Sequence, residues 1–222
     1  MKIIITADGS NSIYVEDLNE HYHSIHGAIQ ESMHIFIQSG LLCEQLSNLQ
    51  EINILEIGFG TGLNTLLTYF AALKNQKNIH YTTIEKYPLK WEEVQQLNYP
   101  DLLEYPHSKN VFKRIHEISW EKAKTVSEGF ILCKHEQSAL EIPYPPNAFD
   151  LVYFDAFAPD VQAELWSEEL FKKIYNSMKT NGILVTYSTK GIVKRALKNV
   201  GFQIEKLPGP KGKREILRAK KE

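Results

Sequence analysis

Cysteine is nearly absent from this chain, and so are long hydrophobic runs. The two cysteines, Cys43 and Cys133, stand far apart in 222 residues, which leaves neither a disulfide framework nor a zinc knuckle. No apolar run approaches the ~18 residues of a membrane span. The N-terminal MKIIITADGSNS has neither the apolar length nor the small-residue cleavage site of a signal peptide. We therefore expect a reduced, cytoplasmic protein with no membrane partner.

The signatures of several enzyme classes are missing as well. The chain has no Gly-x-Ser-x-Gly elbow, no convincing pairing of a nucleophile with histidine, and no Gly-Lys-Ser/Thr phosphate loop. Its composition, 43% hydrophobic and 23% charged, is that of an ordinary globular protein and excludes wholesale disorder. These absences argue against a hydrolase and against a P-loop nucleotide hydrolase.

Charge is distributed unevenly along the chain. The net charge is −2, yet residues 206–222 hold seven Lys/Arg and only two Glu, so the remainder is acidic. A basic terminus on an acidic body is typical of a contact with an anion or a nucleic acid. A merely solubilising C-terminus has the same composition, and composition alone leaves both interpretations open.

Short apolar runs alternate with amphipathic stretches from residue 52 onward, which predicts an α/β fold. Strands are expected at 52–57, 79–84, 130–135, 149–154 and 182–188. Helices are expected at 63–73, after Pro88, at 167–178 and at 190–199. Such alternation implies right-handed crossovers and a parallel sheet covered on both faces.

The end of the chain differs from this alternating pattern. The last two strands, GFQIEKL and REILRAK, are separated by only a short Pro/Gly turn and should pair antiparallel. We predict a doubly wound, mostly parallel seven-stranded sheet with an antiparallel C-terminal hairpin. Residues 51–222 would form this Rossmann-like domain, and residues 1–50, with a helical pattern from about 27 to 46, an extension packing over the active site. Residues 98–129 contain two prolines and show no assignable pattern.

A glycine-rich loop follows the first parallel strand. Glu56 precedes three alternating glycines, Gly58, Gly60 and Gly62, at a strand-to-helix turn. Glycine there lets the backbone approach a ligand without hindrance from a Cβ atom. A dinucleotide site needs Gly-x-Gly-x-x-Gly, but Leu63 stands at its third glycine position. The loop instead resembles the S-adenosylmethionine loop of class I methyltransferases.

Two further acids stand at the ends of the next strands. Glu85 closes the second strand, where a carboxylate can accept both hydroxyls of a ribose. Glu136 follows the third strand, where methyltransferases of this class often contact the adenine amino group. His135 and Gln137 compete with Glu136 for that position, and a solvated surface acid explains Glu136 equally well.

Asp155 stands at the carboxyl end of the fourth parallel strand, in DAFAP. An acid beside the cofactor can accept hydrogen bonds from an amine and orient its lone pair toward a methyl donor. It can also accept the amine's proton, although a nearby anion favours the protonated amine. We therefore predict Asp155 as the catalytic residue, with a role that is chiefly positional.

Several motifs in order resemble the methyltransferase domain of the MnmC family. They are EIGFGTGLN (56–64), EKYP (85–88), DAFAP (155–159) followed by Leu165-Trp166, and KRE (213–215). The N-terminal YHS…GA…ES pattern (22–32) is similar to the stand-alone members called MnmD. The resemblance covers most of the chain, which makes it more specific than the glycine loop alone.

This resemblance implies a function, a cofactor and a partner. The expected activity is S-adenosylmethionine-dependent methylation of 5-aminomethyl-(2-thio)uridine at the tRNA wobble position. The implied cofactor contacts are Glu56, Gly58, Gly60, Gly62, Asn64, Glu85 and Glu136. No fused flavin oxidase domain, such as the one that follows in MnmC, is expected within 222 residues. The alternative is a small-molecule amine methyl- or aminopropyltransferase of the spermidine-synthase type on the same fold.

Other side chains have open interpretations. Phe157, Pro159 and Trp166 are candidates for contact with a flipped-out base, although the aromatic pair fits a core equally well. Lys211, Lys213 and Arg214 are candidates for tRNA phosphates. The H-x-H-x-x-H pattern of His21, His23 and His26 has no fourth ligand at a telling spacing, so no metal is expected. Tyr22 and Glu31 could line the site, but spacing does not establish it.

Overall fold

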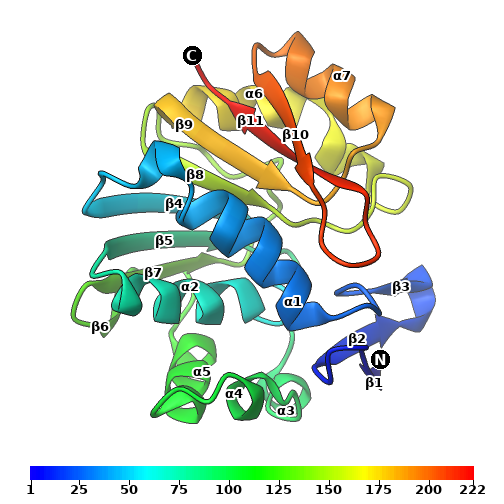
Figure 1. The fold of residues 1–222 in the computed structure, drawn as a ribbon, viewed down its shortest axis with the longest axis vertical. Helices are drawn as coiled ribbons and strands as arrows, with labels where there is room; N and C mark the ends of the chain where they lie inside the picture. The colour runs from blue at the N-terminus through cyan, green and yellow to red at the C-terminus, as the bar shows by residue number, and fades with distance from the viewer.

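A mixed eight-stranded sheet forms the centre of the computed structural model, which describes all residues 1–222 (Figure 1). The strand order is β10-β11-β9-β8-β4-β5-β7-β6. The strands are β4 (Glu51–Ile57), β5 (Asn78–Ile84), β6 (Lys124–Ser127), β7 (Phe130–His135), β8 (Phe149–Phe154), β9 (Met178–Thr186), β10 (Gln203–Pro208) and β11 (Glu215–Lys220). The pairings among β4, β5, β7, β8 and β9 are parallel, and those of β6 with β7, β11 with β9 and β10 with β11 are antiparallel.

The doubly wound sheet and its terminal antiparallel hairpin are therefore confirmed. All seven predicted strands are present, and β6 adds an eighth within the stretch that the sequence left unassigned. β6 is an edge strand whose residues are largely exposed, and its register with β7 shifts between Thr125 and Ser127. An exposed four-residue edge strand carries no hydrophobic alternation, which explains why its sequence gave no signal.

Helices cover both faces of the sheet (Figure 1). On one face lie α1 (Ala28–Ser32) with its π-helical continuation η2 (Met33–Leu41), α2 (Leu63–Lys74) and α5 (Ser108–Glu117). On the other lie α6 (Glu168–Ser177) and α7 (Gly191–Asn199). The alternation of β8 divides its side chains between these faces, because Leu151 and Tyr153 join the first core cluster and Val152 and Phe154 the second.

Local signals explain most of the helix boundaries. The Ser167 hydroxyl accepts a hydrogen bond from the Leu170 N–H and so begins α6, as predicted. The helix predicted after Pro88 is reduced to two single turns, α3 (Trp91–Val94) and α4 (Tyr99–Leu102), since Pro100 cannot continue a preceding helix. The helix expected to reach residue 46 ends at Leu41, before a short turn η3 (Glu44–Leu46).

The N-terminal residues form a separate three-stranded sheet that the sequence did not predict beyond a short first strand. Its strands are β1 (Lys2–Ile5), β2 (Asn11–Val15) and β3 (Glu20–His21), with the turn η1 (Glu16–Leu18) between the last two. It lies beyond the carboxyl ends of the parallel strands, and the β10–β11 turn reaches toward the same place (Figure 1). No helix of the structure has the length and apolar character needed to cross a membrane.

Candidate active site

A single large cavity lies at the carboxyl ends of β4, β5 and β8. Its volume is about 870 Å³, and it is lined by the ends of these strands together with residues of the N-terminal sheet and of the β10–β11 turn. From β4 the chain proceeds to β5 and β7 on one side, whereas β8 and β9 lie on the other. Such a switch point is where open α/β sheets bind ligands, and the volume is in the upper range of small-molecule sites.

The glycine loop passes along one wall of this cavity. Gly58 has φ +91°, and a Cβ atom there would lie 2.6 Å from the Asp155 carbonyl oxygen. Gly60 has φ +49°, and its Cβ would lie 3.0 Å from the Tyr22 ring. Both glycines line the cavity, whereas Gly62 does not and packs instead toward His116. The loop thus needs glycine for close packing against β8 and the N-terminal segment.

Glu56 lies beneath this loop, fully buried, and does not line the cavity. Its Oε2 accepts a 2.7 Å hydrogen bond from the Thr83 hydroxyl, while Oε1 has no partner. Burial raises the pKa of Glu56 to about 8. The predicted direct contact between Glu56 and a ligand is therefore wrong in this geometry, because the side chain does not reach the cavity. Glu56 instead links β4 to β5 below the loop.

Glu85 does line the cavity, at the end of β5. Its two carboxylate oxygens accept backbone hydrogen bonds, from the N–H of Gly60 at 3.1 Å and from that of Tyr87 at 2.9 Å. A carboxylate has further lone pairs, so Glu85 can still accept from a ligand hydroxyl. It also fixes the glycine loop to the neighbouring strand end.

Glu136, in contrast, is exposed and does not line the cavity. Its backbone N–H donates to Glu121, and the next two residues, Gln137 and Ser138, contribute to the cavity wall instead. The geometry therefore favours one of the competing interpretations, in which Gln137 rather than Glu136 faces a ligand after β7.

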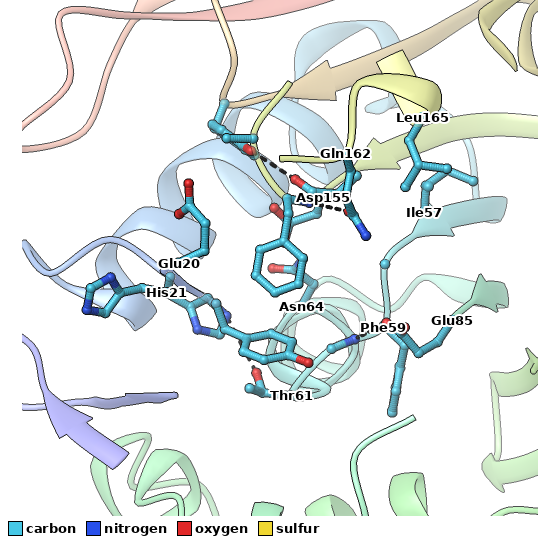
Figure 2. A pocket seen from close by; sticks show the side chains of 18 of the residues that line it. Glu20, His21, Ile57, Phe59, Thr61, Asn64, Glu85, Asp155, Gln162 and Leu165 are labelled. Carbon is cyan, nitrogen blue, oxygen red and sulfur yellow. Dashed lines mark hydrogen bonds between the residues drawn. The ribbon is translucent and has the colours of Figure 1, made fainter. Parts of the chain in front are cut away.

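Asp155 and Asn64 meet near the centre of the cavity, with Glu85 toward one side and His21 toward the other (Figure 2). The Asn64 side-chain amide donates to Asp155 Oδ2 at 2.8 Å. Burial raises the pKa of Asp155 to about 7, against the opposing effect of that hydrogen bond. The Asn64 Oδ1 atom is buried without a partner. A half-neutralised acid and an unsatisfied acceptor thus lie side by side.

The aromatic residues after β8 divide between cavity and core. Phe157 lines the cavity and meets Tyr22 edge-on, with ring centroids 5.0 Å apart. Trp166 is only 2% exposed, lies outside the cavity wall, and donates its indole N–H to the Phe157 carbonyl. Pro159 is likewise buried and outside it. The structure therefore favours the core interpretation for Trp166 and leaves Phe157, which is half-buried, as the aromatic candidate that lines the cavity.

The basic residues of the β10–β11 turn also differ from one another. Lys211 and Arg214 are exposed and lie outside the cavity. Lys213 enters it, forms an ion pair with Glu31 of α1, and lies 4.3 Å from the centroid of the Tyr187 ring. The three predicted phosphate contacts therefore do not form one surface, because Lys213 points into the cavity while Lys211 and Arg214 are exposed outside it.

The three histidines of the N-terminal segment line the cavity but form no metal cluster. No group of three or more His, Cys, Asp or Glu side chains in the chain is arranged to hold a metal ion. Burial lowers the pKa of His23 to about 4, so this side chain is neutral at physiological pH. Its ring lies 3.5 Å from the hydroxyl of Thr61 in the glycine loop.

Tyr187 and Gln162 line the cavity and were missed by sequence reasoning, whereas Gln137 had been weighed against Glu136. Tyr187 follows β9 and donates its hydroxyl to the Ala156 carbonyl at 2.9 Å. Gln162 accepts the Phe157 N–H at 3.0 Å, and Gln137 follows β7. Neither Tyr187 nor Gln162 belongs to a recognisable local motif. Tyr187 stands directly after β9, a place that many inert residues share, and Gln162 lies eight residues beyond the end of β8.

Comparisons with known proteins give a consistent result. A family model described as S-adenosyl-L-methionine-dependent methyltransferase matches residues 93–222, more than half of the chain. The tRNA 5-methylaminomethyl-2-thiouridine biosynthesis bifunctional protein MnmC of Marinomonas sp. (strain MWYL1) is 30% identical over 211 residues, 88% of this chain and 30% of that protein. The chain spans about a third of the length of the curated relatives it matches.

Two solved structures share the fold. The crystal structure of MNMC2 from Aquifex aeolicus has a TM-score of 0.79 at 24% identity, covering 98% of this chain and 69% of that one. The crystal structure of spermidine synthase from Thermotoga maritima has a TM-score of 0.55 at 14% identity, covering 96% of this chain and 69% of that one. At these identities the two likenesses establish the architecture alone.

Proposed function

The chain belongs to the S-adenosyl-L-methionine-dependent methyltransferases, and from that premise we propose that it N-methylates 5-aminomethyl-(2-thio)uridine at the wobble position of tRNA. The similarity to MnmC-type proteins read from the sequence motifs is confirmed at the family level. The tRNA substrate is suggested by the name of these relatives, which are tRNA 5-methylaminomethyl-2-thiouridine biosynthesis proteins. The observation that carries the proposal is the meeting of Asp155, Asn64 and the glycine loop in one cavity.

The cavity has features that fit S-adenosylmethionine. Asn64 lines the cavity and holds the Asp155 carboxylate through its side-chain amide. The Glu85 carboxylate faces the cavity and suits the two hydroxyls of a ribose, and Gly58 and Gly60 of the glycine loop line the same wall. Gln137 and Ser138 are placed to line the adenine end. When bound, the cofactor supplies an electrophilic methyl group on a sulfonium.

Asp155 acts on the acceptor amine. The amine must lose a proton before its lone pair can form the new N–C bond, and Asp155, or a water that it holds, accepts that proton. A carboxyl group whose pKa is about 7 is matched to this task near neutral pH. The Asn64 amide fixes the carboxylate and leaves its other oxygen, Oδ1, for the substrate. Alignment of amine and methyl donor supplies most of the rate.

The remaining expectations concern RNA and domain organisation. We propose that residues 1–50 pack over the active site, because their side chains contribute to the cavity wall from Val15 to Glu31. Phe157 is the candidate for stacking against a splayed-out base. Lys211 and Arg214 are exposed and suited to tRNA phosphates. Work on tRNA would place the enzyme in the cytoplasm.

The alternative, an aminopropyltransferase of the spermidine-synthase type, is not favoured. The likeness to a spermidine synthase extends to the fold at 14% identity. An aminopropyltransferase binds a diamine acceptor, whose two ammonium groups would be served by two acids. The DAFAP segment has only one acid. The basic C-terminal turn suits a polyanion better than a polyamine.

Mass spectrometry of tRNA nucleosides tests the proposal. tRNA that carries 5-aminomethyl-2-thiouridine is incubated with the protein and S-adenosylmethionine, then digested. We expect a gain of one methyl group on that nucleoside and none when the cofactor is omitted. An unmodified nucleoside, alongside methyl transfer to a free small amine in a parallel assay, would overturn the tRNA assignment and favour the alternative.

A further inference from the structure

Two residues contact the ammonium group of Lys213 within the cavity, and a third, Asp155, lines the same cavity. Glu31 forms an ion pair with it, and the Tyr187 ring centroid lies 4.3 Å from Nζ. The Lys213 charge lowers the pKa of Asp155, while the Glu31 charge raises it. We call Glu31, Asp155 and Tyr187 the ammonium cage. Two carboxylates and an aromatic face are the groups that bind a desolvated cation.

Each wall of the cage is fixed by partners of its own. The Ser24 N–H donates to Glu31 Oε2 at 2.9 Å, the Asn64 amide donates to Asp155, and the Tyr187 hydroxyl donates to the Ala156 carbonyl. None of these contacts involves Lys213. The cage is therefore preorganised by its own hydrogen bonds, and the lysine is its occupant rather than its support.

Lys213 enters the cage from a different part of the chain. It belongs to the turn between β10 and β11, and the end of β10 contacts η2 through a 2.8 Å hydrogen bond between His34 Nε2 and the Pro208 carbonyl. Its side chain is 28% exposed, so it can withdraw toward solvent, whereas the Glu31 side chain is only 11% exposed. An unpaired carboxylate at such a site is costly, and some cation must replace the lysine when it leaves.

We infer that the ammonium cage is the binding subsite for the primary ammonium of the acceptor, and that Lys213 occupies it until the substrate displaces it. The inference rests on the proposed function, because it assumes an amine acceptor. An aminomethyl group and a lysine side chain both end in a primary ammonium on a methylene, so the exchange conserves charge and shape. A neutral hydroxyl acceptor leaves Glu31 unpaired and is rejected. Lys213 is thus a specificity-determining residue and not a phosphate contact.

Chemical rescue tests the cage without any tRNA. Lys213→Ala empties the cage and should lower the Tm by about 5 °C or more, because Glu31 loses its cation. Propylammonium chloride at millimolar concentration should restore most of that loss, and 1-propanol should not. In the double variant Glu31→Gln with Lys213→Ala, propylammonium should have no effect. Equal effects of propylammonium and 1-propanol on the Tm, or rescue that persists without Glu31, would contradict the proposal that the cage binds a primary ammonium.

Steady-state kinetics give the second, independent readout. Lys213→Ala should lower the KM for tRNA bearing the aminomethyl group about threefold or more, because the competing cation is gone. Lys213→Met, which keeps the apolar stem over Tyr187, serves if the alanine variant does not fold. A higher KM with a weaker salt dependence would instead make Lys213 a phosphate contact and overturn the exchange.

A matched control comes from Lys179 on β9. It pairs at 2.8 Å with Asp150, whose side chain is 9% exposed, and both residues lie outside the cavity. Lys179→Ala should lower the Tm in the same way but leave the KM unchanged. If the wild-type protein methylates no amine-bearing tRNA, the proposed function fails, yet the rescue by propylammonium still decides whether the cage binds an ammonium.

Discussion

The two sides of the cavity are built from the chain in different ways. On the side that we assign to the cofactor, the glycine loop and Glu85 come from one crossover between β4 and β5, joined by a 3.1 Å hydrogen bond. On the acceptor side, Glu31, Asp155, Tyr187 and Lys213 come from four separate segments. The cofactor side therefore depends on local backbone geometry, whereas the acceptor side depends on the docking of the two ends of the chain. We expect substitutions on the two sides to separate binding from turnover.

The largest effect should follow from Asp155→Ala on the acceptor side. Loss of the carboxylate removes both the orientation of the amine and its proton acceptor, so single-turnover methyl transfer should slow about 10³-fold. S-adenosylmethionine affinity, measured by calorimetry, should change less than about threefold. Asp155→Asn, which preserves the shape, should be nearly as slow. An equally large loss of S-adenosylmethionine affinity would show that Asp155 contributes to cofactor binding instead.

The next largest effect should come from Gly60→Val on the cofactor side. A Cβ there lies 3.0 Å from the Tyr22 ring at φ +49°, so a branched side chain disturbs the loop and fills the adjoining space. The dissociation constant for S-adenosylmethionine should rise at least about 100-fold. Gly9→Val is the matched control, since Gly9 has φ +84° but no atom within 4 Å of its Cβ position. Unchanged affinity in the Gly60 variant would contradict the loop assignment.

A smaller effect concerns stability rather than binding. Glu56 has a pKa of about 8 when folded and near 4.5 when unfolded. Between these values the folded protein keeps a proton that the unfolded chain releases, so the free energy of unfolding should fall as pH rises from 4.5 to 8. Glu56→Gln lacks this pH dependence. At pH 9 its free energy of unfolding should exceed that of the wild type by about 1–2 kcal/mol.

Urea unfolding at pH 5, 7 and 9 measures this difference. Asp155 also has a raised pKa, so it lowers the free energy of unfolding as the pH rises toward about 7. This effect is present in both proteins and cancels in the difference between them. Parallel stability curves for the two proteins would show that Glu56 is ionised in the folded state. Because Glu56 does not line the cavity, its replacement should also leave S-adenosylmethionine affinity nearly unchanged.

The smallest effect should come from Arg214→Ala, at the exposed end of the acceptor side. Removing one phosphate contact should weaken tRNA binding about threefold and reduce the slope of log K against log salt by about one. Cofactor affinity should not change. Filter binding between 50 and 200 mM salt measures both quantities. An unchanged slope would show that Arg214 in the β10–β11 turn does not contact tRNA phosphates.

The same comparison explains what could be predicted from the sequence. The glycine loop could be located from the sequence because strand, acid, glycines and helix follow one another within a few residues of Glu56. That the loop binds the cofactor stays a prediction. The sheet was found for the same reason, since β7 and β8 occupy the predicted residues 130–135 and 149–154. Periodic burial along one strand is a local property of the chain.

The acceptor side could not be derived in this way. Glu31 and Lys213 are 182 positions apart, and nothing in either neighbourhood indicates that they form an ion pair. Lys213 looks like its exposed neighbours Lys211 and Arg214, and only the docking of the turn on the N-terminal segment distinguishes it. Trp166 was ambiguous because an aromatic residue after a strand end fits a core and a base-binding surface equally well.

A crystal structure of the complex with S-adenosylmethionine tests the central claim most directly. We expect the ribose hydroxyls on Glu85, the adenine beside Gln137 and Ser138, and the methyl group directed toward Asp155. Density for the cofactor elsewhere, or a methyl group turned away from Asp155, would contradict the account.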